Sequence, residues 1–399
     1  MRRFAPTAIL APLLVLALAV HWWLWPLTGT DADMDRFLLP WFRHIRDTGP
    51  IAAFAAPFGD YAPSYLYLMA LTTLLADWID PVDLIKALSV AGTLALAAAT
   101  AHLVRATIRN EATPLTAAPE PHRAVLAAAM IAALPSTAIN AVLMGQCDAM
   151  WAAACVMALA AALGRRHGAM MMWCGVALGF KLQAAFFAPF VLALLIRRRV
   201  PFRLWLAAPV AWLGTLLPAW LAGWPAADLL TIYFRQADTY EGLALSAPNI
   251  WMIAEMLPAL RDVPLTGLAL AAAVGAAAAY VAWFSVAPLR GRLLAEVALL
   301  APLIVVGLLP RMHERYFFLA DVIALAIATA WPDRRSIGIA LLVQMGSLLA
   351  LAAYLSGYAV LAVFGAVPMV IATIRLARPL LRRPANDNPP HTPAPALAI

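Results

Sequence analysis

Long apolar blocks recur along almost the whole of this 399-residue sequence. Most of them are about 15 to 25 residues long, and a helix needs about 20 apolar residues to cross a bilayer. Only 12% of the residues are charged while 64% are hydrophobic, whereas a soluble domain carries about 25% charged residues. So few charges cannot cover the surface of a soluble enzyme of this size. The sequence therefore predicts an all-α polytopic membrane protein with about 11–13 transmembrane helices.

Each apolar block can be taken as one predicted span. The block over 169–196 is too long for one comfortable span and is interrupted by Lys181 and Gln183. Two shorter segments that meet there are an equal alternative, because broken helices occur where they line a polar cavity. The predicted spans are 8–25, 62–78, 84–104, 124–140, 149–164, 169–196, 203–221, 265–287, 293–309, 316–331, 336–355 and 358–374.

Arginines gather in the short connections between these blocks, as is typical of the cytoplasmic side of a membrane protein. The position of these arginines explains the net charge of +7 as a feature of membrane topology. We therefore expect no nucleic-acid partner. The opposite side would receive residues 26–61, 222–264 and 310–315. The connection from Arg105 to Arg123 is also basic, but the predicted spans would place it on the opposite side of the membrane. The number of crossings between residues 62 and 104 is therefore left open. The other basic connections are Arg2-Arg3, Arg165-Arg166, Arg197-Arg198-Arg199, Arg290 with Arg292, Arg334-Arg335 and residues 375–383.

The chain divides at its C-terminal end. Residues 1–377 are predicted to form a single transmembrane domain. Six prolines lie among residues 379–395, and a Pro-rich polar segment cannot build a packed core. Residues 378–399 are therefore predicted to be a disordered cytoplasmic tail.

Three aspartates, Asp31, Asp33 and Asp35, lie close together directly after the first span. Crowded carboxylates repel one another, which raises the pKa of at least one of them and suits a general base, or calls for a cation as partner. Residues 37–46 then carry an apolar stripe at helical spacing, opposed by basic residues, which predicts an amphipathic helix lying in the membrane interface. A solvated acidic loop at the start of that helix explains the same carboxylates equally well.

Two short polar segments could hydrogen-bond a sugar. Asp60 and Tyr61 stand at the entrance to the second span, although a turn before Pro63 is a sufficient structural explanation for them. Gln146 and Asp148 form a polar island between two apolar blocks. They could present an amide and a carboxylate to sugar hydroxyls, or Asp148 could simply cap the helix that follows.

Two further segments carry positive charge where a membrane disfavours it. Lys181 stands deep inside an apolar block beside Gln183, too far from either end to snorkel, so it needs an anionic partner, either a carboxylate or a ligand phosphate. The segment Arg311-Met312-His313-Glu314-Arg315 follows a purely apolar span. Its guanidiniums match the geometry of phosphate. The alternative is a loop of mutually paired charges, with Glu314 bound to an arginine.

In the identity of these motifs and in their order along the sequence, the chain resembles the GT-C superfamily of integral-membrane glycosyltransferases that use polyprenyl-phosphate sugars. Within it, the chain is most similar to bacterial mannosyltransferases related to the eukaryotic GPI-anchor mannosyltransferases. The resemblance covers residues 1 to about 375, and Ala62 stands where that pattern has a second proline. The motifs that carry it are Asp33-Met34, Asp60-Tyr61-Ala62-Pro63, Gly145-Gln146-Cys147-Asp148, Phe180-Lys181-Leu182-Gln183, Asn249-Ile250-Trp251 and Arg311-Met312-His313-Glu314-Arg315-Tyr316.

This resemblance implies a site and an activity. The catalytic carboxylate of the superfamily lies in the first extracytoplasmic loop, which carries over to Asp33, with Asp31 and Asp35 as close rivals. The reaction would move a hexose, mannose in the first place, from a polyprenyl-phosphate donor to a hydroxyl of a lipid or glycan acceptor, with inversion. No cofactor is implied beyond an optional Mg²⁺ or Mn²⁺ ion between the carboxylates and the phosphate. The residues expected to bind the substrates are Asp60, Tyr61, Gln146, Asp148, Lys181, Gln183, Arg311, His313, Glu314 and Arg315.

The location follows from the same resemblance, which implies a multi-pass protein of the bacterial inner membrane with its active face outside the cytoplasm. A membrane transporter or a flippase for lipid-linked sugars is the alternative function. It would use the break at Lys181 as part of an ion or lipid path, and it would show inverted repeats, which we do not find in the sequence.

Overall fold

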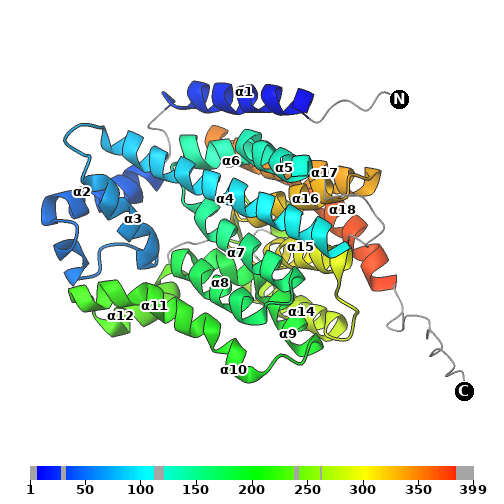
Figure 1. Cartoon of the computed structure of the whole chain (residues 1–399). Coiled ribbons are helices and arrows are strands. Elements are labelled where there is room, and N and C mark those ends of the chain that lie inside the picture. The colour runs from blue at the N-terminus through cyan, green and yellow to red at the C-terminus, as the bar shows by residue number, and fades with distance from the viewer. Residues whose placement is uncertain (1–6, 28–32, 112–120, 238–241, 261–262, 383–399) are drawn as a thin grey trace, which may run out of the picture.

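The computed structural model describes residues 7–27, 33–111, 121–237, 242–260 and 263–382. This part of the chain is almost entirely helical (Figure 1). Its elements are α1 (Thr7–Leu24), η1 (Met34–Leu38), α2 (Leu39–Thr48), η2 (Ala52–Ala55), α3 (Pro63–Thr73), α4 (Pro81–Glu111), α5 (Pro121–Ala133), α6 (Pro135–Ala138), η3 (Ile139–Leu143), α7 (Asp148–Leu163), α8 (His167–Phe180), η4 (Leu182–Phe187), α9 (Ala188–Arg197), α10 (Phe202–Trp205), α11 (Ala207–Ala222), α12 (Ala226–Ala237), β1 (Ala244–Leu245), α13 (Ile250–Glu255), η5 (Pro258–Leu260), α14 (Thr266–Phe284), α15 (Gly291–Leu308), β2 (Met312–His313), α16 (Phe318–Ala330), α17 (Arg334–Ser356) and α18 (Val360–Arg382).

Six helices of the described chain are long and apolar enough to cross a membrane, which makes this an all-α multi-pass membrane protein. A bent pair, His122–Ala133 with Pro135–Leu143, adds a seventh if it counts as one span. The bend of 51° falls at Leu134, which is extended because the ring of Pro135 disfavours the helical conformation before it. The six long helices are Pro81–Arg109, Phe202–Ala222, Thr266–Phe284, Gly291–Leu308, Arg334–Ser356 and Val360–Arg382.

Five shorter apolar helices accompany them, and two of these meet at a break in the block over 169–196. Helix α8 ends at Phe180, Lys181 is extended, and a 3₁₀ helix, η4, continues into α9. The prediction of two shorter segments is therefore confirmed. The short helices are Leu10–Leu24, Asp148–Leu163, His167–Phe180, Leu182–Arg197 and Phe318–Ala330.

The span predicted over 62–78 is wrong. Helix α3 has 11 residues and is only about 16 Å long at 1.5 Å per residue, and turns then lead to Pro81, where α4 begins. Helix α4 then runs for 31 residues, well beyond the predicted 84–104. Hydropathy alone did not separate a short helix followed by apolar turns from a continuous span.

The amphipathic helix expected after the aspartates exists as α2, and a π-helical turn, η1, precedes it. Its apolar residues, among them Phe42 and Ile45, are fully buried by other parts of the protein, while Arg43 and Arg46 are exposed. The apolar side therefore packs on the protein itself, and α2 forms a wall of the site described below.

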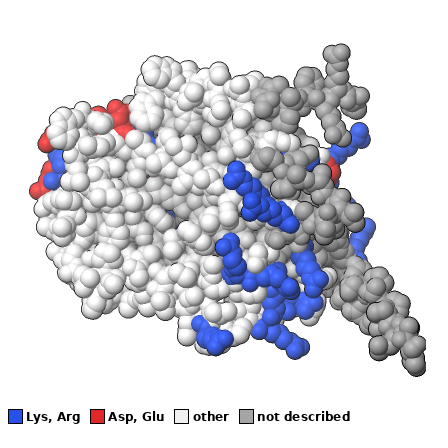
Figure 2. All heavy atoms as spheres, in the orientation of Figure 1, with Lys and Arg blue, Asp and Glu red and all other residues white. Residues whose placement is uncertain are grey.

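Side chains and connections define two ends of the helical bundle. Arg198 donates hydrogen bonds to the carbonyls of Ala162 (2.8 Å) and Leu289 (3.3 Å), so the connections after α7, α9 and α14 meet at one place. We call this the arginine end, and Figure 2 shows Lys and Arg gathered there, away from the acidic residues on the left of the view. At the other end, which we call the pocket end, the first residue of α7, Asp148, contacts Lys181 directly after α8.

The boundary predicted at residue 378 falls inside a helix. Helix α18 continues to Arg382 through Pro379, because Leu376 and Leu380 remain buried against the other helices. The predicted disorder of the tail from 383 onward lies outside the described residues.

Candidate functional site

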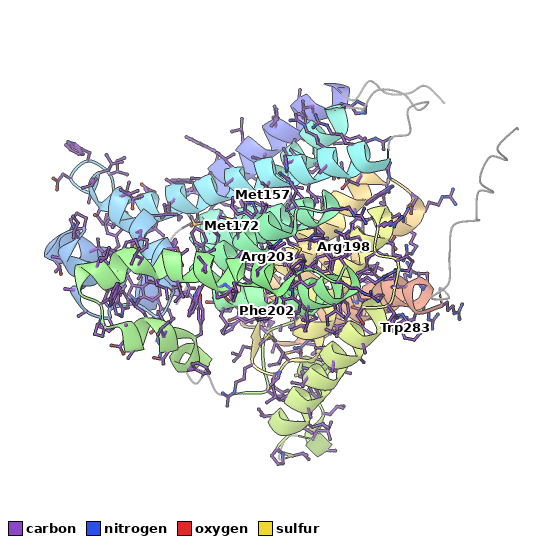
Figure 3. All side chains as sticks on the ribbon, turned by 60° about the horizontal axis from the view of Figure 1, so that its bottom comes forward. Met157, Met172, Arg198, Phe202, Arg203 and Trp283 are labelled. Atoms are coloured by element: carbon purple, nitrogen blue, oxygen red, sulfur yellow. The ribbon has the colours of Figure 1, made fainter. Side chains whose placement is uncertain are left out.

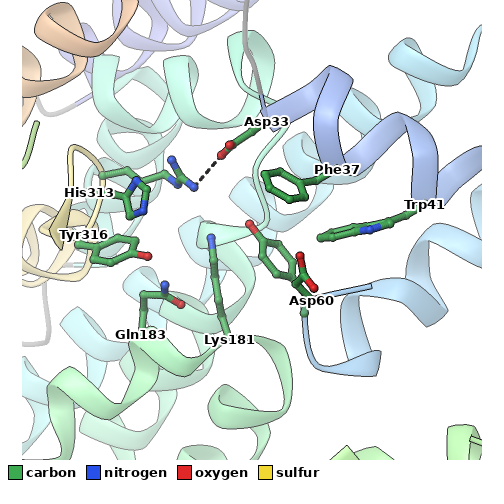
Figure 4. Close-up of a pocket in the computed structure, with 10 residues that line it drawn as sticks. Asp33, Phe37, Trp41, Asp60, Lys181, Gln183, His313 and Tyr316 are labelled. Carbon is green, nitrogen blue, oxygen red and sulfur yellow. Dashed lines mark hydrogen bonds and ion pairs between the residues drawn. The ribbon is translucent and has the colours of Figure 1, made fainter. Parts of the chain in front are cut away.

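A pocket at the pocket end collects polar and aromatic side chains from four distant segments of the chain (Figure 4). Its free volume is about 30 Å³, which is room for one or two water molecules and not for a hexose. The pocket is therefore too narrow for a sugar ring in this conformation. The lining residues are Asp33, Phe37, Trp41, Asp60, Tyr61, Lys181, Gln183, His313, Arg315 and Tyr316.

Asp33 enters the pocket from the start of η1. Its Oδ2 atom accepts a hydrogen bond from Arg315 Nη2 at 2.8 Å, the dashed line in Figure 4. It accepts a second one from Gln146 Nε2 at 2.9 Å. Asp35 is exposed and does not line the pocket, and Asp31 lies outside the described residues. Of the two described aspartates of this cluster, Asp33 is thus the one that faces the basic groups.

Glycine at position 145 is required for this arrangement. Gly145 has a φ of +64°, and a Cβ atom there would lie 2.6 Å from the Cε atom of Met34. The left-handed backbone would strain any larger residue, and an added Cβ atom would also push the flexible end of the Met34 side chain aside. This contact holds the turn that carries Gln146 against the turn that carries Asp33.

Lys181 and Asp148 form a buried ion pair with 2.7 Å between Nζ and Oδ1, and each side chain is 2% exposed. Asp148 also accepts hydrogen bonds from Trp151 Nε1 (2.9 Å) and Asn140 Nδ2 (2.8 Å). The anionic partner that Lys181 needed is therefore Asp148. Since Asp148 does not line the pocket, its carboxylate neutralises and orients Lys181 from behind.

Gln146 connects the carboxylate and the ammonium sides of the network. Its Nε2 group donates to Asp33, while its Oε1 atom accepts from the Tyr61 hydroxyl at 3.1 Å and lies 3.4 Å from Lys181 Nζ. Lys181 Nζ also stands 4.8 Å from the centroid of the Tyr61 ring. All polar groups of the Gln146 amide are engaged, so it positions its neighbours and does not line the pocket.

The arginine-rich loop after α15 is held in place by the rest of the protein. Strand β2 pairs in parallel with β1, and the N–H group of Arg311 donates to Leu243 O at 2.8 Å. Asn249 caps α13 by accepting from the N–H groups of Trp251 and Met252, and Trp251 Nε1 donates to Leu308 O at 2.6 Å. The motif at 249–251 therefore braces the end of α15 and does not line the pocket.

Within this loop, Glu314 is completely buried and binds Arg315, while its Oε2 atom lies 3.6 Å from His313 Nδ1. The predicted alternative of internally paired charges thus applies to Glu314. Arg311 adopts a left-handed backbone, with a φ of 59°, and its side chain does not line the pocket. The loop presents His313, Arg315 and the adjacent Tyr316 to the pocket instead.

Burial and charge pairing set the ionisation of these groups. Burial acts to raise the pKa of Glu314, but Arg315 and His313 hold it down to about 2. Burial acts to lower the pKa of Arg315, but Glu314 and Asp33 raise it well above its ordinary value. Burial raises the pKa of the Tyr61 phenol well above its ordinary value. Glu314 and Arg315 are therefore charged at neutral pH, and Tyr61 is a neutral donor.

The positive groups of the pocket already have acidic partners. Asp33, Asp148 and Glu314 contact Lys181 and Arg315, so three carboxylates face two permanent cations. An incoming phosphate would have to displace Asp33 from Arg315 or bring further positive charge with it. Among the described residues, no three His, Cys, Asp or Glu side chains group as metal ligands; since Asp31 is not among them, the optional Mg²⁺ or Mn²⁺ ion stays a prediction.

Gln183 offers a hydrogen-bond acceptor to a ligand. It is 4% exposed, and its Oε1 atom is buried with no hydrogen-bond partner in the described structure. Figure 4 shows it beside Tyr316 on the wall formed by η4. A buried polar atom without a partner is costly, and a hydrogen-bond donor of a bound ligand would satisfy it. Asp60, in contrast, lies exposed at the mouth.

Three aromatic residues of the pocket, Phe37, Trp41 and Tyr316, were not among the predicted site residues. Phe37 and Trp41 were assigned to a stripe facing the membrane, yet they line the pocket, and the ring centroids of Trp41 and Tyr61 are 5.0 Å apart. The spacing of Asp33, Phe37 and Trp41 was the available signal, because residues four apart share one helix face. Asn140 and Trp151, which hold Asp148, gave no comparable signal.

Comparisons with known proteins were made on the whole chain. No protein-family model matches it, and no curated protein matches it either.

Proposed function

We propose that this protein is an integral-membrane glycosyltransferase. It would move a hexose, with mannose as the first choice, from a polyprenyl-phosphate donor to an acceptor hydroxyl on the extracytoplasmic side, with inversion. The observation that carries the proposal is the meeting of a carboxylate, Asp33, with Lys181, His313 and Arg315 in one pocket at one end of the bundle. These residues are the ones that the resemblance assigns to the sugar and its phosphate.

The reaction needs two functions, a base for the acceptor hydroxyl and positive charge for the leaving phosphate. The acceptor oxygen attacks the anomeric carbon while the bond from that carbon to the phosphate oxygen breaks and its electron pair leaves with the phosphate. The hydroxyl proton passes to Asp33 as general base. Arg315, Lys181 and His313 stabilise the charge that grows on the phosphate. In this scheme donor phosphate takes over the contact of Arg315, which frees Asp33 for the acceptor.

An apolar groove provides a binding site for the polyprenyl chain. It has a volume of about 730 Å³ between α9, α14 and α15, and Ala185 and Leu309 border it at the pocket end. These two residues lie two positions from Gln183 and Arg311 along the chain. Leu192 and Val274 of the same groove are exposed on the outside of the bundle, where lipid would reach them. A donor in the membrane could therefore keep its tail in this groove and its phosphate at the pocket.

We further infer twelve crossings with both chain ends in the cytoplasm. Removing α3 and dividing 169–196 at Lys181 makes every basic connection, including 105–123, fall on one side, in agreement with the positive-inside rule. The arginine end would then be cytoplasmic and the pocket end extracytoplasmic. The crossings would be α1, α4, α5 with η3, α7, α8, η4 with α9, α10 with α11, α14, α15, α16, α17 and α18.

The decisive experiment substitutes the proposed base. Asp33→Asn removes the proton acceptor but keeps the shape of the side chain, so transfer of mannose from a polyprenyl-phosphate donor to a mixed membrane-lipid acceptor fraction should fall by about 10²-fold or more. Asp35→Asn changes an exposed neighbour and should keep its activity. Both rates are measured with purified protein in detergent.

Full activity of Asp33→Asn would remove Asp33 as the base. Loss of folding in that variant is recognised by its thermal unfolding, and Asp33→Glu then serves as the second probe. A transferase is active in detergent micelles, whereas transport can be measured only between two separated compartments. If the wild type transfers no sugar in micelles with any donor sugar tried, the transporter alternative is favoured.

A further inference from the structure

A second apolar groove lies between α4, α7 and α8. Its volume is about 680 Å³, and it is bordered by alanines, methionines and aromatic residues. Ala91, Ala95 and Ala98 are exposed, so the groove is open along the outside of the bundle. The lining residues are Leu68, Leu88, Ala91, Gly92, Ala95, Ala98, Ala99, His102, Met150, Ala153, Ala154, Met157, Trp173, Val176 and Phe180.

The length and lining of this groove suit a single acyl chain. Along α4 it extends from Leu88 to His102, about 21 Å at 1.5 Å per residue. One leaflet of a bilayer core is about 15 Å thick, so the groove can hold one acyl chain along its whole length. His102 is the only ionisable residue of the lining, and it stands at the end nearest the arginines.

Three exposed arginines surround that end of the groove. Arg105 and Arg109 follow His102 at helical spacing on α4, and Arg166 comes from the connection between α7 and α8. Arg166 follows the end of α7 by three residues, and Met157 of that helix lines the same groove. None of them forms an ion pair with a carboxylate among the described residues. The apolar groove therefore ends in a cluster of positive charge that has no carboxylate partner in the described part of the chain.

We propose that this groove binds an anionic phospholipid, with one acyl chain along α4 and the phosphate between Arg105, Arg109 and Arg166. Charge complementarity selects a lipid with a net negative headgroup over a zwitterionic one. The glycosyl donor does not fit this site in the same way, because its phosphate belongs near Lys181 at the opposite end of α8. The site thus stands independently of the proposed transferase activity.

The experiment is a titration of the purified full-length protein in detergent, with bound lipid counted by native mass spectrometry. Phosphatidylglycerol and phosphatidylcholine with identical chains are compared, and inorganic phosphate is added alone in a third series. We expect phosphatidylglycerol to bind at least about fivefold more tightly than phosphatidylcholine, since each arginine near a lipid surface contributes about that factor.

Two pairs of variants separate headgroup from chain. The triple variant Arg105→Ala, Arg109→Ala, Arg166→Ala should weaken phosphatidylglycerol binding by about tenfold or more. Its control removes Arg203, Arg334 and Arg382, which are equally exposed but belong to α10, α17 and α18 and not to the helices that border the groove. Met157 of the groove and Arg203 are both labelled in Figure 3. Ala95→Trp should fill the groove and weaken binding, whereas Leu94→Trp, on the neighbouring exposed position, should not.

Equal binding of the two lipids, or equal loss in both triple variants, would overturn the headgroup site. Binding of inorganic phosphate that depends on the three arginines, together with no effect of Ala95→Trp, would replace the lipid by a free anion and also overturn the proposal. Thermal unfolding of each variant without added lipid separates a failure to fold from a failure to bind.

Discussion

At the scale of single residues, the buried pair of Lys181 and Asp148 supports the whole pocket. Each charge would be costly alone in this environment, and the pair is completed by neutral donors from Asn140 and Trp151. Such a pair contributes little net stability compared with apolar packing, but removal of one partner leaves a charge without compensation. The pair therefore fixes the position of the Lys181 ammonium more than it stabilises the fold.

Asp148→Asn should destabilise the protein by about 3–5 kcal/mol, because Lys181 would be left buried without a carboxylate. The double variant Asp148→Asn, Lys181→Met should recover a large part of that loss. Thermal or denaturant unfolding of the two single variants and the double variant in detergent checks the coupling. Additive effects of the two substitutions would contradict the interaction.

Glu314 predicts an acid dependence of stability. Its pKa of about 2 in the folded protein lies below the ordinary value of about 4.3 for a glutamate. The ionised carboxylate therefore stabilises the folded protein fully at pH values above about 4.3. This contribution is lost as the pH falls from about 4.3 through 2, and it amounts to at most about 3 kcal/mol. The unfolding temperature of Glu314→Gln should therefore depend less on pH over this interval than that of the wild type. Parallel curves would show that Glu314 is not the group responsible.

At the scale of elements, the turn η1 and helix α2 combine the proposed base and an aromatic wall on one side. The periodicity of residues 37–46 predicted the helix, but not that its apolar side would be covered by protein. Hydropathy measures how far a side chain avoids water and does not distinguish lipid from a protein neighbour. The break at Lys181 was one of two alternatives that the sequence left open, because a charge interrupts the apolar run there. No charge interrupts residues 62–76, and the short length of α3 was missed.

Phe37→Leu tests the aromatic wall. Leucine keeps an apolar side chain of similar size but removes the ring, which is worth about 0.5–1.5 kcal/mol in aromatic contacts, so KM for the donor or the acceptor should rise about twofold to tenfold with little change in kcat. Phe58→Leu is the matched control, because Phe58 packs on Phe54 and Trp224 outside the pocket lining. A similar rise of KM in both variants would make the effect one of folding.

At the scale of the whole molecule, the sequence motifs predicted several residues of the pocket, including Asp33, Tyr61, Lys181, Gln183, His313 and Arg315. Their proximity could not be derived from spacing, since it depends on how the helices pack. Asp148, Gln146 and Glu314 were identified as polar in unusual places, but their function as partners of other side chains becomes visible only from the distances between them.

The inferred topology predicts opposite labelling of the two ends of α17. Ser356→Cys at its pocket end should react with a membrane-impermeant maleimide in intact bacterial cells, and Arg334→Cys at its arginine end should react only after the membrane is opened. Both positions are exposed, while two of the three native cysteines are buried and the third is partly so, which keeps the background low. Labelling of both in intact cells would contradict the orientation.

Asp33 and Arg315 are 282 positions apart in the chain, and this separation has a consequence for biosynthesis. While the ribosome is still threading the protein into the membrane, the early aspartate is present long before its guanidinium partner is made. A nascent chain that stops before the fifteenth helix therefore contains most of the hydrophobic scaffold but no assembled centre. The centre can therefore be completed only late in translation, when α16, α17 and α18 are all that remains of the helical scaffold to be made.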